Sequence, residues 1–101
     1  CDAGGGCMPD EPSVSQLLHN AIGGGGYLAG VLGLVLVAIA ALGWQGGRWL
    51  GALGLVAAAV AITALFAIEA WLAWRGALQR SAEAAFLVWF LACGWWLSRR
   101  P

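Results

Sequence analysis

Long runs without any charged residue constrain this chain more than any other feature. Residues 17–47 carry no formal charge, and a second uncharged run covers residues 49–68. A helix needs about 20 apolar residues, rising about 1.5 Å each, to cross the ~30 Å hydrocarbon core of a bilayer. In this chain 61% of residues are hydrophobic and 10% are charged, whereas soluble domains have roughly 45–50% and about 25%. The sequence therefore predicts an all-α integral membrane protein and excludes a soluble globular domain.

Polar segments divide the chain into an arm and a helical region. Residues 1–16 contain a glycine run, two prolines and three of the five acids, so we expect an extracytoplasmic arm there. Residues 17–101 form the expected helical membrane domain. Its helices are predicted at about 21–42, 49–74 and 84–98. The breaks between them are predicted as a tight turn, GWQGGRW (43–49), and a polar stretch, RGALQRSAE (75–83).

The third apolar segment is the shortest of the three. Residues 84–97 would span roughly 21 Å as a helix, which is less than the hydrocarbon core. Such a helix crosses if the bilayer thins and the flanking Arg80 and Arg99 extend toward the headgroups. Otherwise it lies at the interface or packs against the first two helices. The predicted fold is thus a helical hairpin plus a third short apolar helix, with two to three transmembrane helices.

Aromatic residues are expected to anchor the helices, because Trp and Tyr favour the two membrane–water boundaries. One boundary should hold Tyr27, Trp71 and Trp74. The other should hold Trp44, Trp49, Trp95 and Trp96.

All five cations are arginines, and their positions predict the orientation. With the N-terminus outside, three arginines lie inside and two outside, as the positive-inside rule favours. The inside set is Arg48, Arg99 and Arg100, and the outside set is Arg75 and Arg80.

Small residues recur at helix-packing intervals on both predicted hairpin helices. Helices in lipid associate by close van der Waals approach, which small side chains permit. The packing candidates are Gly30, Gly33, Gly51, Gly54, Ala58 and Ala61. One interpretation is a hairpin that packs against itself, and the other is a subunit that also mates with further copies. We favour self-assembly, because one intramolecular seam would not use all of these residues.

The cysteines leave three alternatives open for the arm. Cys1 and Cys7 could form a disulfide in an oxidising compartment, remain free thiols, or include an acylated Cys1 at a processed N-terminus. Two thiols and His19 fall short of the usual four ligands of a metal site, so we expect no metal. Cys93 is expected to act as a small buried hydrophobe.

No constellation in the sequence predicts catalysis. The hydroxyl residues do not stand near His19 with an acidic partner in a recognisable spacing, so we expect no enzyme and no cofactor. Glu69 and Glu83 are expected at the boundary, the second paired with Arg80 three residues earlier. The net charge is zero, which gives no basic footprint for nucleic acid.

The order of segments over residues 13–68 resembles the conjugative-type pilins of type IV secretion systems. SVSQLLHNAIGGGG leads into a first apolar helix, YLAGVLGLVLVAIAAL. The one-cation loop GWQGGRW and the second helix LGALGLVAAAVAITALFAI follow. The resemblance implies a hairpin held in the inner or plasma membrane, then extracted with phospholipid into an extracellular filament for DNA or effector transfer. It also implies a lipid- or lumen-facing role for Arg48.

The departure from that family is the C-terminal third, since its pilins generally end soon after the second helix. We expect a structural subunit whose partners are membrane lipid and further copies of itself, with a conjugative-type pilin as the most specific hypothesis. One alternative is a small accessory subunit of a respiratory or photosynthetic complex, partnered by larger subunits. A further alternative is a holin-like pore-former.

Overall fold

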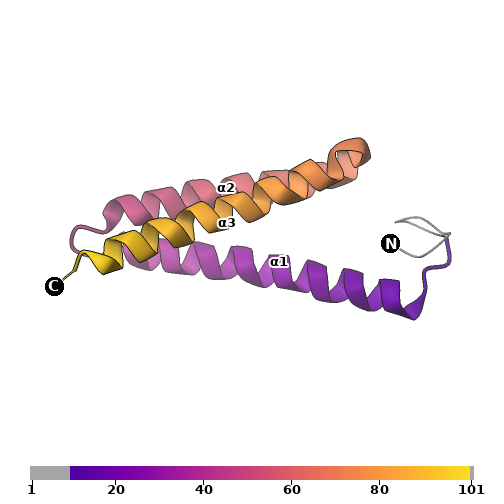
Figure 1. Cartoon of the computed structure of the whole chain (residues 1–101), viewed down its shortest axis with the longest axis horizontal. Coiled ribbons are helices and arrows are strands. Elements are labelled where there is room, and N and C mark those ends of the chain that lie inside the picture. Colours follow the sequence, from indigo (N-terminus) through magenta and orange to yellow (C-terminus); the bar gives the residue numbers. More distant parts are fainter. Residues whose placement is uncertain (1–9, 101) are drawn as a thin grey trace. The chain divides into compact units, whose positions relative to one another are not determined.

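The computed structural model describes residues 10–100, and every regular element in that range is helical (Figure 1). Helix α1 is Val14–Ala41, α2 is Arg48–Ala70 and α3 is Arg75–Ser98, with a short 3-10 helix, η1, at Leu72–Trp74. The predicted all-α class is confirmed. Cys1 and Cys7, and the chemistry proposed for them, lie outside the described residues.

Each of the three long helices is long and apolar enough to cross a bilayer. Helix α1 has 28 residues, α2 has 23 and α3 has 24. At about 1.5 Å per residue these helices measure roughly 42, 34 and 36 Å, against a hydrocarbon core of about 30 Å. By length and composition the chain is a membrane protein with three candidate spans, and its third helix is not short.

Helix α3 begins at Arg75, well before the start near residue 84 that the sequence suggested. The stretch 75–83, expected to be a break, forms its first turns. The Gln79 side-chain amide donates to a Glu83 carboxylate oxygen one turn later (3.3 Å), and the Ser81 hydroxyl donates to the Ala77 carbonyl (2.9 Å). Polar side chains interrupt an apolar run without interrupting a helix, because such residues have good helix propensity.

The break between α2 and α3 lies instead at Trp71, whose φ of −129° and ψ of 66° are not helical. The expected helix 49–74 therefore ends at Ala70, and η1 leads directly into α3. No glycine or proline marks this corner in the sequence, which is why the polar residues that follow it were the stronger signal.

The chain divides between Gly30 and Val31 into two compact units, and this boundary falls within α1. In the first unit, α1 begins at Val14, inside the expected arm. Ser13 caps it: its hydroxyl oxygen accepts from the Gln16 amide at 3.1 Å, the first half of a capping box. The Gln16 side-chain amide donates to the Asn20 side-chain oxygen at 2.8 Å.

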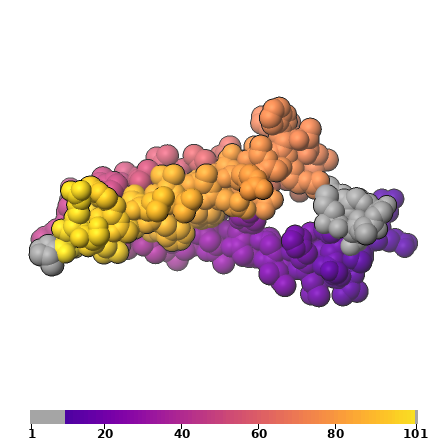
Figure 2. Space-filling model, in the orientation of Figure 1, coloured from indigo at the N-terminus to yellow at the C-terminus, as the bar shows by residue number. Residues whose placement is uncertain are grey.

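In the second unit, residues 31–100 form what we call the three-helix unit. Helices α2 and α3 run antiparallel and pack along their length (Figures 1 and 2). The buried face of α2 repeats at helical spacing and consists almost wholly of small residues: Leu50, Gly51, Gly54, Ala57, Ala58, Ala61 and Ala64. Large apolar side chains point outward instead, as expected for helices that meet lipid.

The interior of the three-helix unit has two adjoining clusters. In one, Val31 of α1 meets Ala61 and Ala64 of α2 and Ala82 of α3. In the other cluster, the buried members are Leu34, Ala57, Ala58 and Trp89. Trp89 is the one bulky α3 side chain among them, and it fills the space that the alanines leave. Cys93, which was expected to be buried, packs against this second cluster but is only half-buried.

The turn between α1 and α2 is tight, as its glycines predicted. The Gly47 amide donates to the Trp44 carbonyl (3.0 Å), and Gly46 has a φ of 71°. That left-handed conformation is readily adopted by glycine and disfavoured for residues with a Cβ. The turn therefore brings the end of α1 and the start of α2 close together.

Candidate functional site

Four tryptophans and three arginines gather at one end of the three-helix unit, where the α1–α2 turn meets the end of α3. We call this set the Trp–Arg cluster. Its members are Trp44, Arg48, Trp49, Trp95, Trp96, Arg99 and Arg100. The antiparallel course of α2 and α3 produces the cluster, because it places the first turn of α2 beside the last turn of α3.

Two pairs of indole rings join the turn to α3. Trp44 and Trp96 are stacked, with ring centroids 5.4 Å apart and planes inclined by 14°. Trp49 meets Trp95 edge to face, at 6.1 Å and 76°. Aromatic pairs of this kind contribute about 0.5–1.5 kcal/mol beyond the area that they bury. The tryptophans expected at one membrane boundary thus also contact one another.

The two arginines that follow α3 lie over these rings. The Arg99 guanidinium is 4.5 Å from the Trp95 ring centroid, and that of Arg100 is 3.5 Å from the Trp96 centroid. A cation over an indole face is attracted by the ring quadrupole. Their place at the C-terminus of α3 is also favourable, since the negative end of the helix dipole lies there.

Two hydrogen bonds fasten α3 to the backbone of the turn. The Trp96 indole N–H donates to the Gly46 carbonyl (3.1 Å), and the Arg100 guanidinium donates to the Gln45 carbonyl. Both acceptors lie in a turn that has no further helical partner for them, so the bonds satisfy carbonyls that would otherwise depend on water. The sequence offered no signal for these long-range bonds.

Two shallow hollows flank Trp44 and Gln45 on the surface of the cluster. One is lined by Arg48, Trp49 and the glycines of the turn. The other is lined by Trp96, Leu97 and Arg100. Each hollow therefore combines a guanidinium, an indole and turn backbone. Arg48, the residue singled out from the sequence, is exposed at the first position of α2.

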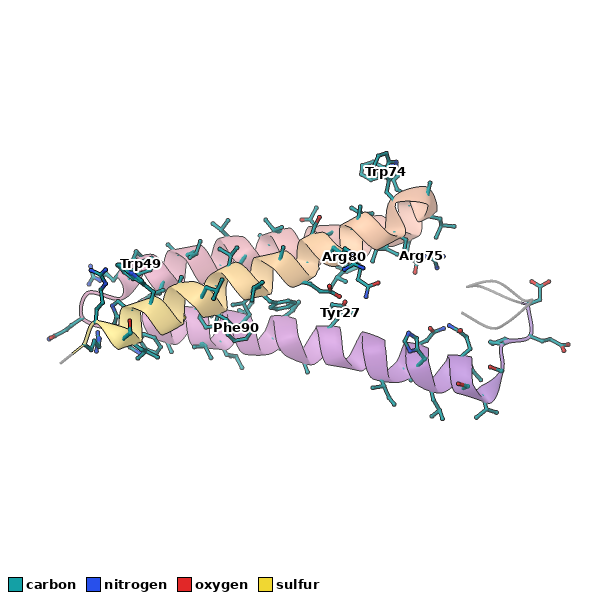
Figure 3. The ribbon with its side chains drawn as sticks, viewed as in Figure 1. Tyr27, Trp49, Trp74, Arg75, Arg80 and Phe90 are labelled. Carbon is teal, nitrogen blue, oxygen red and sulfur yellow. The ribbon has the colours of Figure 1, made fainter. Side chains whose placement is uncertain are left out.

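The opposite end of the α2–α3 pair has a different character. Trp49 and Trp74 mark the two ends in Figure 3, and Trp74 projects outward beside η1. Trp71 and Trp74 line a shallow hollow with Ala77, Leu78 and Ser81. Arg75 and Arg80 lie on the first turns of α3 at this end. Tyr27, expected at the same boundary, belongs to the first unit and is half-buried on α1.

The charged residues near this end are placed as follows. Glu69 is exposed in the last turn of α2. Glu83 is exposed on α3 and accepts a hydrogen bond from Gln79. The sequence had predicted a pairing of Glu83 with Arg80 and did not predict this hydrogen bond. His19 is exposed on α1 in the first unit.

The predicted packing residues separate into two groups. On α2, Gly51, Gly54, Ala58 and Ala61 are all buried inside the three-helix unit. On α1, Gly30 and Gly33 are exposed, and a Cβ added at Gly33 would meet no atom within 4 Å. The small residues of α2 therefore serve packing within the chain, whereas Gly33 has no such role in the three-helix unit.

Gly54 is tightly packed, and Trp89 is one of the two side chains against it. The Trp89 indole N–H donates to the Leu50 carbonyl at 3.0 Å, a buried bond between α3 and α2. A Cβ on Gly54 would lie 2.6 Å from Nε1 of Trp89 and 2.7 Å from Cβ of Ala38 on α1. Gly54 thus permits three helices to meet at one point. No local spacing in the sequence predicts this contact of Trp89.

Among residues 10–100, no group of three or more His, Cys, Asp or Glu side chains is placed to hold a metal ion. Comparisons of the chain with protein-family models, with curated proteins and with solved structures found no match. The resemblance to conjugative-type pilins therefore stays a prediction. The structure identifies the chain as an all-α membrane protein with three candidate spans.

Proposed function

We propose that this chain is a non-enzymatic structural subunit of a membrane, which self-assembles through the outer surface of α1. The observation that carries the proposal is the exposed Gly33, which has open space where a side chain would be. Gly30 lies three residues earlier on α1 and is also exposed, so the two glycines share a face of that helix. Lipid chains gain nothing from such a notch, whereas a second helix can approach it closely.

The most specific form of this proposal is a conjugative-type pilus subunit with phospholipid packed against it. What supports it is the order of elements: an apolar α1, a tight turn, one arginine at the start of α2, and a small-residue α2. In this form the chain rests in the inner or plasma membrane with its N-terminus outside, and then enters an extracellular filament. In this form, α3 would be a third helix packed against the hairpin.

One observation favours a second candidate, an accessory subunit of a larger membrane complex. The small-residue face of α2, which a two-helix subunit could offer to its neighbours, is covered here by α3 and the end of α1. Trp89 fastens that cover with its bond to Leu50. A chain that covers its own small-residue helix face has less surface left for packing against further copies of itself. Such a chain suits partners that contact only its exterior.

The test of self-assembly is a leucine at Gly33. The chain is crosslinked in native membranes with a reagent that does not rely on disulfide formation. The wild type should give oligomers, and Gly33→Leu should give mostly monomers, because the bulky side chain blocks helix approach. Ala59→Leu is the matched control, since Ala59 is exposed on α2, and its oligomers should persist. Equal oligomer yields for both variants would remove α1 as the mating surface.

Gly54→Leu is unsuitable as an assembly test, because Gly54 lies inside the three-helix unit. The pilus form is tested separately. Intact cells are sheared, and the released material is examined by electron microscopy and mass spectrometry. Filaments made mainly of this chain are the expected result. Recovery of the chain only in membranes, beside larger subunits, would replace the pilus proposal with the accessory-subunit proposal.

A further inference from the structure

The end of the three-helix unit that carries the Trp–Arg cluster has an excess of positive charge. Arg48, Arg99 and Arg100 lie there, and the carboxylates within residues 31–100 are Glu69 and Glu83. Glu69 is in the last turn of α2, at the other end. Glu83 is about 22 Å along α3 from Ser98, from the helical rise, which exceeds the ~8 Å screening length at physiological salt.

Arg99 and Arg100 are held in place by rings and backbone. Arg99 lies over Trp95, while Arg100 lies over Trp96 and donates to the Gln45 carbonyl. None of these partners carries a negative charge. A guanidinium has five N–H donors, so each arginine keeps donors for an anion and has a fixed orientation in which to offer them.

The surroundings of these arginines select the kind of anion. Leu97 is 60% exposed and Trp95 is 52% exposed, and Leu97 lines the same hollow as Arg100. Charge and exposed apolar surface are therefore adjacent, at the end of a helix long enough to cross a bilayer. A phospholipid has the same sequence of chemistries, with a phosphate next to an acyl chain, and indole rings favour that depth.

We propose that Arg99 and Arg100 bind the phosphate of an anionic phospholipid, whose acyl chain lies along Trp95 and Leu97. The site is formed by the C-terminal end of α3 against the α1–α2 turn. It makes this end of the chain selective for the leaflet that is rich in anionic lipid. The proposal goes beyond self-assembly and applies equally if the chain packs against other subunits.

The experiment is native mass spectrometry of the detergent-purified chain, titrated with phosphatidylglycerol or with phosphatidylcholine of the same acyl chains. The wild type should bind phosphatidylglycerol more tightly. R99Q/R100Q should lose about fivefold in affinity per arginine, roughly 25-fold together. R75Q/R80Q, which removes two arginines from the other end of α3, is the matched control and should keep the preference. R99K/R100K should keep most of it, because the charge remains.

Three results would overturn the proposal. The first is equal affinity of the wild type for the two lipids. The second is a loss in R75Q/R80Q as large as that in R99Q/R100Q, which would mean diffuse electrostatics. The third is displacement of phosphatidylglycerol by an equal concentration of glycerol phosphate, which would mean a site for a soluble anion.

A measurement on the wild type keeps the proposal testable if R99Q/R100Q fails to fold, as judged by circular dichroism. Phosphatidylglycerol with a photoreactive headgroup is crosslinked to the chain, and the adducts are mapped by peptide mass spectrometry. Adducts on residues 95–100 support the site. Adducts confined to residues 71–81 contradict it. Neither result depends on whether the chain forms oligomers, so this proposal and self-assembly can fail separately.

Discussion

Replacing Gly54 by alanine should destabilise the three-helix unit, although alanine is the better helix former. An ideal Cβ at this position would lie 2.6 Å from Nε1 of Trp89 and 2.7 Å from Cβ of Ala38. Both separations are far below the ~3.5–4.0 Å optimum for non-bonded heavy atoms. Helix α2 must then move away from α3, from α1 or from both. Movement of Trp89 breaks its bond to the Leu50 carbonyl.

The magnitude follows from three terms in the free energy of unfolding. Overpacking a well-filled interior costs about 1–3 kcal/mol. Loss of the indole hydrogen bond costs about 1 kcal/mol. The higher helix propensity of alanine returns about 1 kcal/mol. The expected net loss is therefore about 1–3 kcal/mol, a large fraction of the stability of a small domain.

The assay is unfolding of the purified chain in mixed micelles, titrated with sodium dodecyl sulfate and followed by circular dichroism. Gly33→Ala is the matched control, because it makes the same substitution in a helix where the new Cβ meets nothing within 4 Å. It should leave stability unchanged or raise it by up to about 1 kcal/mol. The packing argument is refuted if Gly54→Ala proves as stable as Gly33→Ala.

A double substitution identifies the atom that resists the new methyl group. Trp89→Phe removes the indole nitrogen nearest to it, at the cost of the bond to Leu50. Gly54→Ala and Trp89→Phe together should therefore cost less than the sum of the two single changes. Strictly additive losses of stability would show that the new methyl group does not clash with Trp89. Ala38 on α1 would then be the residue that it clashes with.

Three further substitutions test the turn and the start of α1. Gly46→Ala should cost about 1–2 kcal/mol, since Gly46 has a φ of 71°, whereas Gly43→Ala, whose new Cβ would be 3.5 Å from its nearest neighbour, should change stability little. Trp96→Phe should cost about 1 kcal/mol, because it keeps a ring against Trp44 but loses the bond to the Gly46 carbonyl. Ser13→Ala should cost about 1 kcal/mol of helix stability, seen as faster amide exchange in the first turn of α1.

Each of these has an outcome that would contradict it. Equal stability of the Gly46 and Gly43 variants would argue against the left-handed turn. A Trp96→Phe chain with unchanged stability would mean that the indole bond to the turn contributes nothing. Unchanged exchange in Ser13→Ala would mean that the hydroxyl does not cap α1.

The positions of the tryptophans along the sequence are enough to predict part of the candidate site. Trp44 and Trp49 bracket the glycine turn, and Trp95 and Trp96 close the last apolar run, so an antiparallel course places all four at one end. That Trp44 stacks on Trp96 while Trp49 meets Trp95 edge to face is a different kind of fact. It depends on the rotation of α3 about its own axis, which no local spacing fixes.

The first turns of α3 show where a sequence rule misleads. Residues 75–83 are polar and were expected to interrupt the helix, yet they form it. Hydropathy reports what surrounds a segment, whereas helix formation depends on backbone bonding and side-chain freedom. The predicted start of α1 was also too late, because the Ser13–Gln16 capping signal was present in the sequence and went unused.

The sequence by itself determined the helical class and the membrane environment, because long uncharged runs have no other stable arrangement in a bilayer. It also determined the turn at Gly46 and the small-residue stripe of α2. Only the tertiary structure decided what that stripe contacts. Glycine permits close approach without naming the partner, and here the partners are Trp89 and Ala38 of the same chain. Gly33 on α1 is exposed and has no such partner within the three-helix unit. We therefore place the proposed assembly surface on α1.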